Sequence, residues 1–497
     1  MRESMKEDIL RCFQSVYDAH TYIEQLVQNR KYEEAKVLLA DCQNVVVQIG
    51  TTVENFETDN TSVVPLLEAY CEAVYQVYST IVTIEHIKNF LDQVLNKAEK
   101  QIREDIKPKK EIVFMPYKSS MWDSLESIWK AADEDPDCEA YVVPIPYYDR
   151  KSDFSLGEFH YEGTDFPDYV PITNYEAYDL QSRKPDVIYI HNPYDEGNYV
   201  TSVDPKFYSV ELKKYTKCLV YVPYFLAGYY SSATSARRNV PYCISHVDVC
   251  VIQSEMQKKV LSVNQDLSNK MVALGSPKID RIVSPIKEPS CLIEKEKING
   301  KKVVLVNTSI SRILNDQQWF EKMDKLIHIF EQRSDLFMLW RPHPLLFTTI
   351  DTMLPNRKDE MSSIINQIEK LDNSYIDRTV SADAAIAISD GLISDYSSLV
   401  LQYTATGKPS LLTVGSSAYR NTKVVCGDYF SNYFIKDGVS IEDFFTIIES
   451  GNDYKKEERM KYFRESVINT DGTCGKKVHA YIKELGQGYE IQARRFG

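Results

Sequence analysis

The sequence lacks several features that would place it in a common class of protein. Its ten cysteines include no Cys-x-x-Cys pair, and the nearest two, Cys243 and Cys250, do not have the spacing of a zinc site. This usage predicts reduced core cysteines in a cytoplasmic protein. Residues 1–10 are charged and have no apolar signal-peptide core, and the most apolar window, residues 218–230, is too short to span a bilayer.

Two nucleotide-binding motifs are also missing, because no Gly-x-Gly-x-x-Gly fingerprint and no Walker A loop occurs. The acidic run of Asp133, Asp135 and Asp137 has no apolar strand leading into it, so we expect a solvated turn there rather than a metal site. We accordingly expect neither a metal nor a cofactor. A net charge of −14 and a pI near 5.2 argue against broad nucleic-acid binding, which needs a basic face.

The first part of the chain is predicted to be helical. A length of 497 residues suits two or three domains. Apolar residues follow helical spacing near residues 9–20, 32–56 and 61–84, and no glycine lies between Met1 and Val47. Residues 1–105 therefore predict an antiparallel helical bundle or hairpin, followed by a polar linker at 101–110. Because its chemistry is unremarkable, we interpret it as a docking or dimerising module, with a homo-oligomer or a membrane surface as its partner.

From Glu111 onward the pattern changes to strands that alternate with helices. The strands expected are residues 112–115, 140–145, 187–190, 219–224, 249–252 and 271–274, then 302–306, 337–340, 384–393 and 410–414. A charged stretch with two prolines, residues 284–300, is the expected domain boundary. Two successive βαβ blocks predict two doubly wound α/β domains, residues 111–285 and 300–485, which face each other across a cleft.

The most informative segment is Ser394-Asp395-Tyr396-Ser397-Ser398, which lies between an apolar run and the predicted start of a helix. Paired hydroxyls and backbone N–H groups at the positive end of a helix suit a phosphate. A second loop, Arg341-Pro342-His343-Pro344, follows the apolar residues 336–340. We expect Arg341 to neutralise a diphosphate and the proline-fixed His343 to move a proton or bind a phosphate oxygen. A helix cap, a proline turn and a surface ion pair are the alternatives.

Ligands of such sheets lie beyond the carboxyl ends of the strands, so the other polar residues at these ends complete the predicted site. These residues are Lys118, Ser119, Trp122, His191, Asp195, Tyr224, Gly275, Ser276, Asn307 and Thr308. For His191, a buried interior histidine is as good an interpretation as a functional one. The pair of Ser119 and Ser120 is a weak signal, because serine caps many helices.

At these residues the chain resembles the CDP-glycerol:poly(glycerophosphate) glycerophosphotransferases, the teichoic acid polymerase family. The likeness is carried by the two loops above, by Lys408-Pro409, by Gly275-Ser276-Pro277-Lys278-Ile279-Asp280 and by Asp471-Gly472. It spans roughly residues 111–485 and leaves the helical N-terminus outside. The resemblance implies a GT-B-like fold of two facing Rossmann-type domains. It also implies transfer of glycerol phosphate or ribitol phosphate from a CDP-linked donor, with release of CMP. The acceptor would be a hydroxyl of a cell-surface polymer or lipid-linked precursor in the bacterial cytoplasm, near the membrane's inner face.

By this resemblance the second domain holds the donor, and His343, Ser397 and Ser398 would contact its phosphates. We expect His343 to be catalytic, and we expect the other donor-binding residues to be Arg341, Ser394, Asp395, Asn307, Thr308, Gly275 and Ser276. We expect Lys118, Ser119, Trp122 and Tyr224 to bind the acceptor.

One segment departs from the family pattern. The family carries His-Gly-Thr-Pro after a first-domain strand, and its histidine is thought to act as the base. Pro223-Tyr224-Phe225-Leu226-Ala227-Gly228, at the corresponding place, contains no histidine. Either His191 or Asp195 serves instead, or the acceptor differs, or catalysis is lost. A nucleotide-sugar glycosyltransferase, a UDP-sugar epimerase-like enzyme and a catalytically degenerate assembly module are the rival interpretations.

Overall fold

The computed structural model divides into two compact units, which are described separately. Unit 1 is Met1–Ile112 with Asp135–Ala140 and Asp179–Val187, and unit 2 is Val113–Glu134, Tyr141–Tyr178 and Ile188–Gly497. The residues described are 1–56, 62–82, 85–151, 153–198, 200–227, 229–230, 240–261, 265–284, 293, 295–343, 346–379, 381–395, 397–414, 423–424 and 431–496. Among the helices of these residues, none combines the length and the apolar character needed to cross a bilayer.

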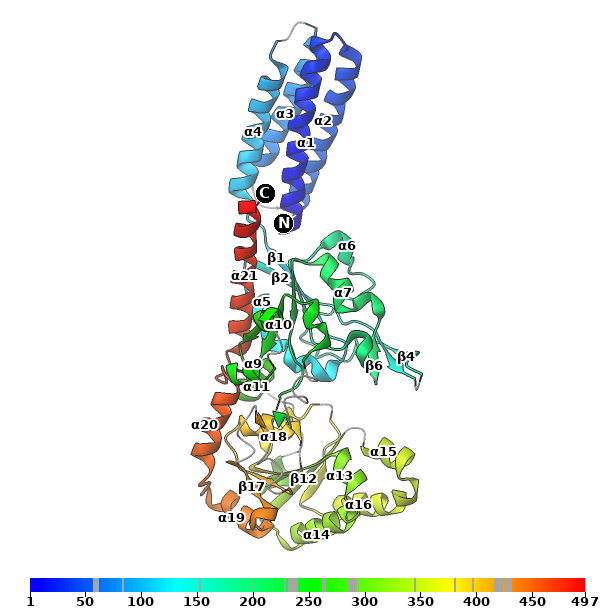
Figure 1. The fold of residues 1–497 in the computed structure, drawn as a ribbon, viewed down its shortest axis with the longest axis vertical. Helices are drawn as coiled ribbons and strands as arrows, with labels where there is room; N and C mark the ends of the chain where they lie inside the picture. Colours follow the sequence, from blue (N-terminus) through cyan, green and yellow to red (C-terminus); the bar gives the residue numbers. More distant parts are fainter. Residues whose placement is uncertain are drawn as a thin grey trace. The chain divides into compact units, whose positions relative to one another are not determined.

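The N-terminal module is a four-helix bundle (Figure 1). Its helices are α1 (Glu3–Gln28), α2 (Tyr32–Phe56), α3 (Val63–Thr80) and α4 (Ile87–Asp105). Each helix buries one apolar stripe, and neighbouring helices pack in the order of the sequence, with α4 closing on α1. The predicted helical module is confirmed, although helix α4 runs through half of the expected linker and the third predicted helix already ends at Thr80.

A buried hydrogen-bond network crosses the centre of this bundle. The imidazole of His20 on α1 is fully buried, and its Nε2 lies 2.6 Å from the Tyr70 hydroxyl on α3. Its Nδ1 lies 2.7 Å from Oδ1 of Asp92 on α4. Burial lowers the pKa of His20 and so favours the neutral ring. The network joins three helices through polar groups that would otherwise be unsatisfied in the core.

The first α/β part is built on a six-stranded sheet with the order β10-β9-β7-β5-β1-β2. The strands are β1 (Lys110–Met115), β2 (Cys138–Val142), β5 (Val187–Ile190), β7 (Cys218–Tyr221), β9 (Val249–Ile252) and β10 (Met271–Ala273). All six predicted strands are present. A small antiparallel sheet, β4-β3-β6, was not predicted; it is formed by β3 (Tyr147–Arg150), β4 (Leu156–His160) and β6 (Thr201–Val203). The helices are α5 (Glu126–Asp133), α6 (Leu180–Arg183), α7 (Ser209–Leu212), α9 (Glu255–Leu261), α10 (Gln265–Lys270) and α11 (Pro277–Val283).

The second α/β part has a parallel six-stranded sheet with the order β13-β12-β11-β14-β15-β17. The strands are β11 (Lys302–Thr308), β12 (Leu336–Pro342), β13 (Ser374–Ile376), β14 (Gly391–Ser394), β15 (Ser410–Leu412) and β17 (Tyr433–Phe434). The helices are α12 (Lys295–Ile298), α13 (Ile310–Asn315), α14 (Trp319–Gln332), α15 (Leu346–Met353), α16 (Lys358–Lys370), α17 (Asp383–Ile388), α18 (Ser398–Thr404), α19 (Ile441–Ser450) and α20 (Lys456–Ser466). The last helix, α21 (Cys474–Phe496), packs against α5 and α11 of the first α/β part.

Strand β11 explains why this sheet has two apolar faces. Val304 and Val306 point into the core formed with α14, α16 and α19, whereas Val303 and Leu305 point into the core formed with α17, α18 and α20. This alternation is the two-residue period of a strand buried on both sides. The two parallel sheets confirm the expected GT-B-like pair of Rossmann-type domains behind a helical module. The boundary expected at 284–300 stays a prediction, because both sheets contribute to unit 2.

The prediction of one strand over residues 384–393 was wrong. Helix α17 occupies Asp383–Ile388, and only the four residues of β14, Gly391–Ser394, are extended. A run of ten mostly apolar residues is equally compatible with a buried helix and a buried strand, so periodicity could not separate them. Strands β13 and β17 were missed because they are only three and two residues long.

Candidate functional site

The two predicted loops open from strands that flank the same central strand. In the sheet, Thr308 of β11 is paired with Pro342 of β12, and Asn307 of β11 is paired with Ser394 of β14. Neighbouring strands lie about 4.8 Å apart, so the starts of the two loops are about 10 Å apart, with the end of β11 between them. A diphosphate-sized ligand at this sheet edge would be within reach of both loops.

The backbone of His343 is locked to the end of β11. Its N–H donates to the Thr308 carbonyl at 3.1 Å, and its carbonyl accepts from the N–H of Leu346 at the start of α15 at 2.8 Å. The imidazole is exposed at the sheet edge, yet its surroundings remove enough water to lower the pKa of His343. A neutral imidazole at pH 7 can donate one hydrogen bond. Pro344 lies outside the described residues.

Arg341 does not project from the loop as expected. Its Nη1 forms a buried ion pair with Asp377 and lies 3.2 Å from the Thr379 hydroxyl, while Nη2 donates to the Thr379 carbonyl at 3.0 Å. The bidentate contact predicted with a diphosphate is thus replaced by contacts inside the domain. This geometry assigns Arg341 to holding the loop in place.

Hydrogen bonds between side chains also fix the end of β14. Asn307 Nδ2 donates to the Ser394 hydroxyl at 2.9 Å, and that hydroxyl donates to the Asp395 carbonyl at 2.9 Å. The Trp340 indole donates to the Thr308 hydroxyl at 3.2 Å. Asn307, Thr308 and Ser394 are therefore oriented toward one another rather than toward solvent.

The start of α18 is capped as the sequence indicated. Ser397 is the N-cap, and its hydroxyl accepts from the N–H of Leu399 at 3.2 Å. The side chain of Ser398, the first helical residue, is exposed. Tyr396 lies outside the described residues. The hydroxyls and N–H groups of this turn begin directly after β14, on the edge that His343 also occupies.

The carboxylate of Asp395 is only partly hydrogen-bonded. Its Oδ2 accepts from both the N–H and the hydroxyl of Ser309, each at 2.9 Å. Its Oδ1 is buried and has no hydrogen-bond partner among the described residues. Burial is the main cause that raises the pKa of Asp395. A carboxylate in this state can accept a hydrogen bond from a ligand hydroxyl or amine.

Asp395 lies in the wall of a pocket of about 330 Å³ in the second sheet's domain. The strand ends at Asn307 and Thr308 also line it, and α14 supplies an apolar wall that includes Trp319 and Met323. The volume falls in the range of small-molecule sites. This pocket is not apparent from the sequence, because α14 and the residues directly after β17, Ile435 and Lys436, meet Asp395 only in the folded domain.

We predict that Asp395→Asn raises the free energy of unfolding by about 1 kcal/mol at pH 7, because it removes a buried charge with one unpaired oxygen. The asparagine oxygen can keep both bonds from Ser309. The folded-state pKa of Asp395 is raised, so the wild-type penalty disappears as the pH falls through that pKa. The gain in unfolding free energy of Asp395→Asn over the wild type, measured from their urea midpoints, should therefore be smaller at lower pH than at pH 7.

Asp316 lines the same pocket and is a matched control, because replacing it should have the opposite effect on stability. Hydrogen bonding from Lys322 is the main cause that lowers its pKa. The carboxylate of Asp316 stabilises the folded chain at any pH above the pKa that it has in the unfolded chain. This stabilisation is lost as the pH falls through the lower pKa that it has in the folded chain. Asp316→Asn should therefore lower stability at pH 7, and two variants shifting stability in the same direction would contradict the assignment.

The first sheet carries a separate pocket of about 650 Å³ at the ends of β1, β5 and β7. Four tyrosines line it: Tyr117, Tyr194, Tyr224 and Tyr242. Lys118 is also in its wall, with its ammonium 4.7 Å from the ring centre of Tyr147. Lys118 and Tyr224 were predicted here, whereas the other tyrosines were not. Gly228, at the end of the divergent family segment, lies outside the described residues.

Two residues predicted to bind the acceptor are engaged elsewhere. Trp122 is 1% exposed and packs against Trp129 and Phe166, so it belongs to the core and cannot contact an acceptor. Both the N–H and the hydroxyl of Ser119 bind Glu162 Oε2, at 2.8 and 3.1 Å. The spacing in the sequence placed both residues correctly after β1 but could not show which way their side chains turn.

The two candidate bases are buried. His191 is 0% exposed; its Nε2 accepts from the Tyr117 N–H at 3.1 Å, and its Nδ1 lies 3.2 Å from the Ser124 hydroxyl. Burial lowers the pKa of His191 to about 3, so the ring is neutral and both nitrogens are used. Asp195 is also buried and accepts from the N–H of Ser209. These contacts correct the expectation that either side chain faces a substrate; His191 positions Tyr117 instead.

The family-like segment at Gly275–Asp280 packs against the chain just before α21. The carboxylate of Asp280 accepts from the N–H groups of Cys474 and Gly475, at 3.0 and 2.7 Å, and so caps α21. Gly275 has φ +100°, and a Cβ there would lie 2.3 Å from the Ile468 carbonyl oxygen. The Ser276 hydroxyl is buried without a partner among the described residues. These contacts give Gly275 a packing role in place of the predicted contact with the donor.

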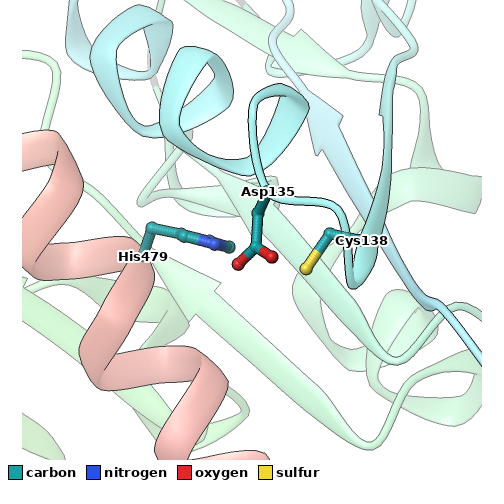
Figure 2. A group of neighbouring side chains, drawn as sticks. All are labelled: Asp135, Cys138 and His479. Atoms are coloured by element: carbon teal, nitrogen blue, oxygen red, sulfur yellow. The ribbon is translucent and has the colours of Figure 1, made fainter.

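Two groups of side chains among the described residues contain potential metal ligands. Asp149, Glu158 and His160 bring ligand atoms within 4.8 Å of one another, but both carboxylates are exposed, and His160 Nε2 is 2.9 Å from Asp149 Oδ2. Figure 2 shows Asp135 and Cys138 at the turn before β2, where the Cys138 N–H donates to the Asp135 carbonyl at 3.0 Å. His479, also drawn there, is on α21 and belongs to unit 2, whereas Asp135 and Cys138 belong to unit 1. No metal role is assigned.

Two Rossmann-type domains with polar loops at their strand ends define a GT-B-like protein. The model of the CDP-Glycerol:Poly(glycerophosphate) glycerophosphotransferase family matches residues 227–484, more than half of the chain, and the chain belongs to this family. The match includes both loops and the Gly275–Asp280 segment. No curated protein matches the chain.

Several solved structures are similar to the chain at low identity. The wall teichoic acid polymerase TagF is 15% identical, with a TM-score of 0.48 over 85% of this chain and 98% of that chain. The S. aureus MnaA–UDP co-structure is 14% identical, with a TM-score of 0.44 over 76% of this chain and 96% of that chain. A UDP-N-acetylglucosamine 2-epimerase is 9% identical, with a TM-score of 0.48 over 76% and 97%. Likenesses of this degree carry no information about substrate or reaction.

Proposed function

We propose that the chain transfers glycerol phosphate from CDP-glycerol, or a related CDP-alditol, to a hydroxyl of a polymer or lipid-linked precursor. The acceptor oxygen attacks the glycerol-bearing phosphorus, and the bond from that phosphorus to the bridging oxygen breaks. CMP leaves with the bridging oxygen, and the acceptor releases one proton. Such transfers depend mainly on positioning and on neutralising charge.

In this proposal the donor binds at the edge of the second sheet. The diphosphate would contact the imidazole of His343 and the hydroxyls and N–H groups at Ser397 and Ser398. The pocket beside Asp395 would receive the nucleoside, with Oδ1 accepting one of its hydrogen bonds. Arg341 holds the His343 loop through Asp377.

In this proposal the acceptor binds in the tyrosine-lined pocket of the first sheet. Tyrosine presents both an apolar ring and a hydroxyl, which suits a polyhydroxylated chain. Lys118 would attract the phosphates of a growing anionic polymer. The family match through both second-domain loops is the observation that carries the proposal.

The direct test supplies CDP-glycerol and a short glycerol phosphate polymer to the full chain. We expect CMP release, with acceptor mass rising in steps of one glycerol phosphate. A thermal-shift panel of CDP-glycerol, CDP-ribitol and UDP-N-acetylglucosamine identifies the donor class, because a ligand that binds only the folded chain raises its melting temperature. Stabilisation by the UDP-sugar alone would overturn the proposal in favour of a nucleotide-sugar enzyme.

A second candidate is a chain that binds a CDP-alditol without transferring its alditol phosphate. It is favoured by the pocket of the first sheet, whose described lining residues include no imidazole and no carboxylate. Thermal stabilisation by CDP-glycerol together with no CMP release from any acceptor would support this candidate.

A further inference from the structure

The helical bundle carries a groove of about 610 Å³ between α2 and α3. Its α2 wall consists of residues spaced three and four apart, Gln43, Val46, Val47, Gly50, Thr51 and Glu54. The α3 wall repeats this spacing from Val64 to Tyr75. Each wall spans eleven residue steps, which is about 16 Å or three helical turns. The groove therefore has the length and the straight course of a short helix.

The floor of the groove is apolar and open. Gly50 has no side chain, and a Cβ placed there would meet only Leu67 Cδ1, at 3.7 Å. Two apolar side chains stand exposed on opposite walls: Val47 is 52% exposed and Tyr75 is 62% exposed. An amphipathic helix would bury both of them, which is the usual way a helix binds in a groove.

The charged side chains in the groove are all negative. Glu54, Glu68 and Glu72 line it, and no lysine or arginine is among its described lining residues. Glu68 and Glu72 are four residues apart on α3, a like-charge spacing that destabilises a helix unless a cation lies nearby. Together α2 and α3 contain six carboxylates and one lysine.

We propose that this α2–α3 groove binds a basic amphipathic helix of another protein. Its apolar side would cover Val47 and Tyr75, and its lysines or arginines would pair with the three glutamates. A second copy of the bundle would place carboxylates against carboxylates, and an anionic membrane would repel the same rim. The proposal does not depend on the transferase activity.

The test measures binding of a fluorescent fourteen-residue peptide of leucine and lysine, arranged with the period of a helix, to the full chain by anisotropy. A peptide of the same composition with leucine and lysine alternating, and one with glutamate in place of lysine, should bind at least tenfold more weakly. Glu68→Lys/Glu72→Lys should weaken binding about tenfold or more, because it reverses two pairing charges. Val47→Ser/Tyr75→Ser should weaken it similarly.

Asp41→Lys is the matched control, because Asp41 is exposed on α2 but does not line the groove. It makes the charge change of one of the two Glu→Lys replacements and should alter the dissociation constant less than twofold. All four replaced groove residues are exposed, so the variants should keep the melting temperature of the wild type. Equal binding by groove variants and control, or by helical and alternating peptides, would overturn the proposal.

Two further measurements test whether the groove instead binds a second copy of the chain or a membrane. If sedimentation shows a dimer that the groove variants abolish, the groove binds a second copy. If the chain binds vesicles of three parts phosphatidylcholine to one part phosphatidylglycerol, and the groove variants abolish this, it binds a membrane. Either result would overturn the proposal.

Discussion

Replacing His343 by alanine is expected to reduce CMP release from CDP-glycerol by about a hundredfold or more. A positioned donor aimed at charge that develops in the transition state typically contributes this much to turnover. The imidazole is exposed at the sheet edge, and the backbone of the loop is fixed by Thr308 and Leu346. The variant should therefore fold normally and still be stabilised by CDP-glycerol, so that turnover falls while the melting temperature holds.

His328→Ala is the matched control for this experiment. His328 is an exposed histidine on α14 of the same domain, where its Nδ1 lies 3.0 Å from Glu331. Its loss should leave turnover within about twofold of the wild type, because a surface pair contributes little. Near-normal CMP release by His343→Ala would remove this residue from the mechanism while leaving the family assignment intact.

The largest effect on stability is expected from Gly275→Ala. A methyl group would lie 2.3 Å from the Ile468 carbonyl oxygen, and the residue would also have to keep φ at +100°. Strain and overpacking together should lower the free energy of unfolding by about 2–4 kcal/mol. All four tryptophans lie in unit 2, so the urea midpoint followed by tryptophan fluorescence reports on the unit that contains Gly275.

Gly300→Ala separates the cost of backbone strain from the cost of the steric clash. Gly300 has φ +74°, but no atom lies within 4 Å of its added Cβ, so this variant carries the backbone strain without the clash. We expect it to cost about 1 kcal/mol. Similar costs for both variants would mean that the chain around Ile468 moves away easily, and that the Gly275 segment is not the tight contact that the structure shows.

Several features of the site were predictable because they are local. Each predicted strand-end loop does follow a strand, the Ser397 cap lies where a serine before an apolar helix indicated it, and the bundle follows from helical spacing alone. These signals depend on neighbours within a few residues, so they survive in a single sequence. Of the acidic run of Asp133, Asp135 and Asp137, the first and the last are exposed, whereas Asp135 is half-buried.

The direction of each side chain could not be predicted in the same way. Arg341 finds its partner in Asp377, 36 residues later, and Asp280 caps a helix that begins 194 residues later. Burial of His191 depends on strands from several parts of the chain. Nothing in the spacing near these residues encodes such partners.

The sequence by itself determined the helical module, the alternation of strands with helices and the edge at which polar loops gather, because backbone period and the burial of alternating apolar residues are local properties. Only the tertiary structure decided which polar groups face outward. It turned Trp122, His191 and Asp195 inward, gave Arg341 an internal partner, and formed the pocket beside Asp395 and the acidic groove of the bundle. Those outcomes depend on packing between distant segments, where each buried polar group must find a partner that the folded chain supplies.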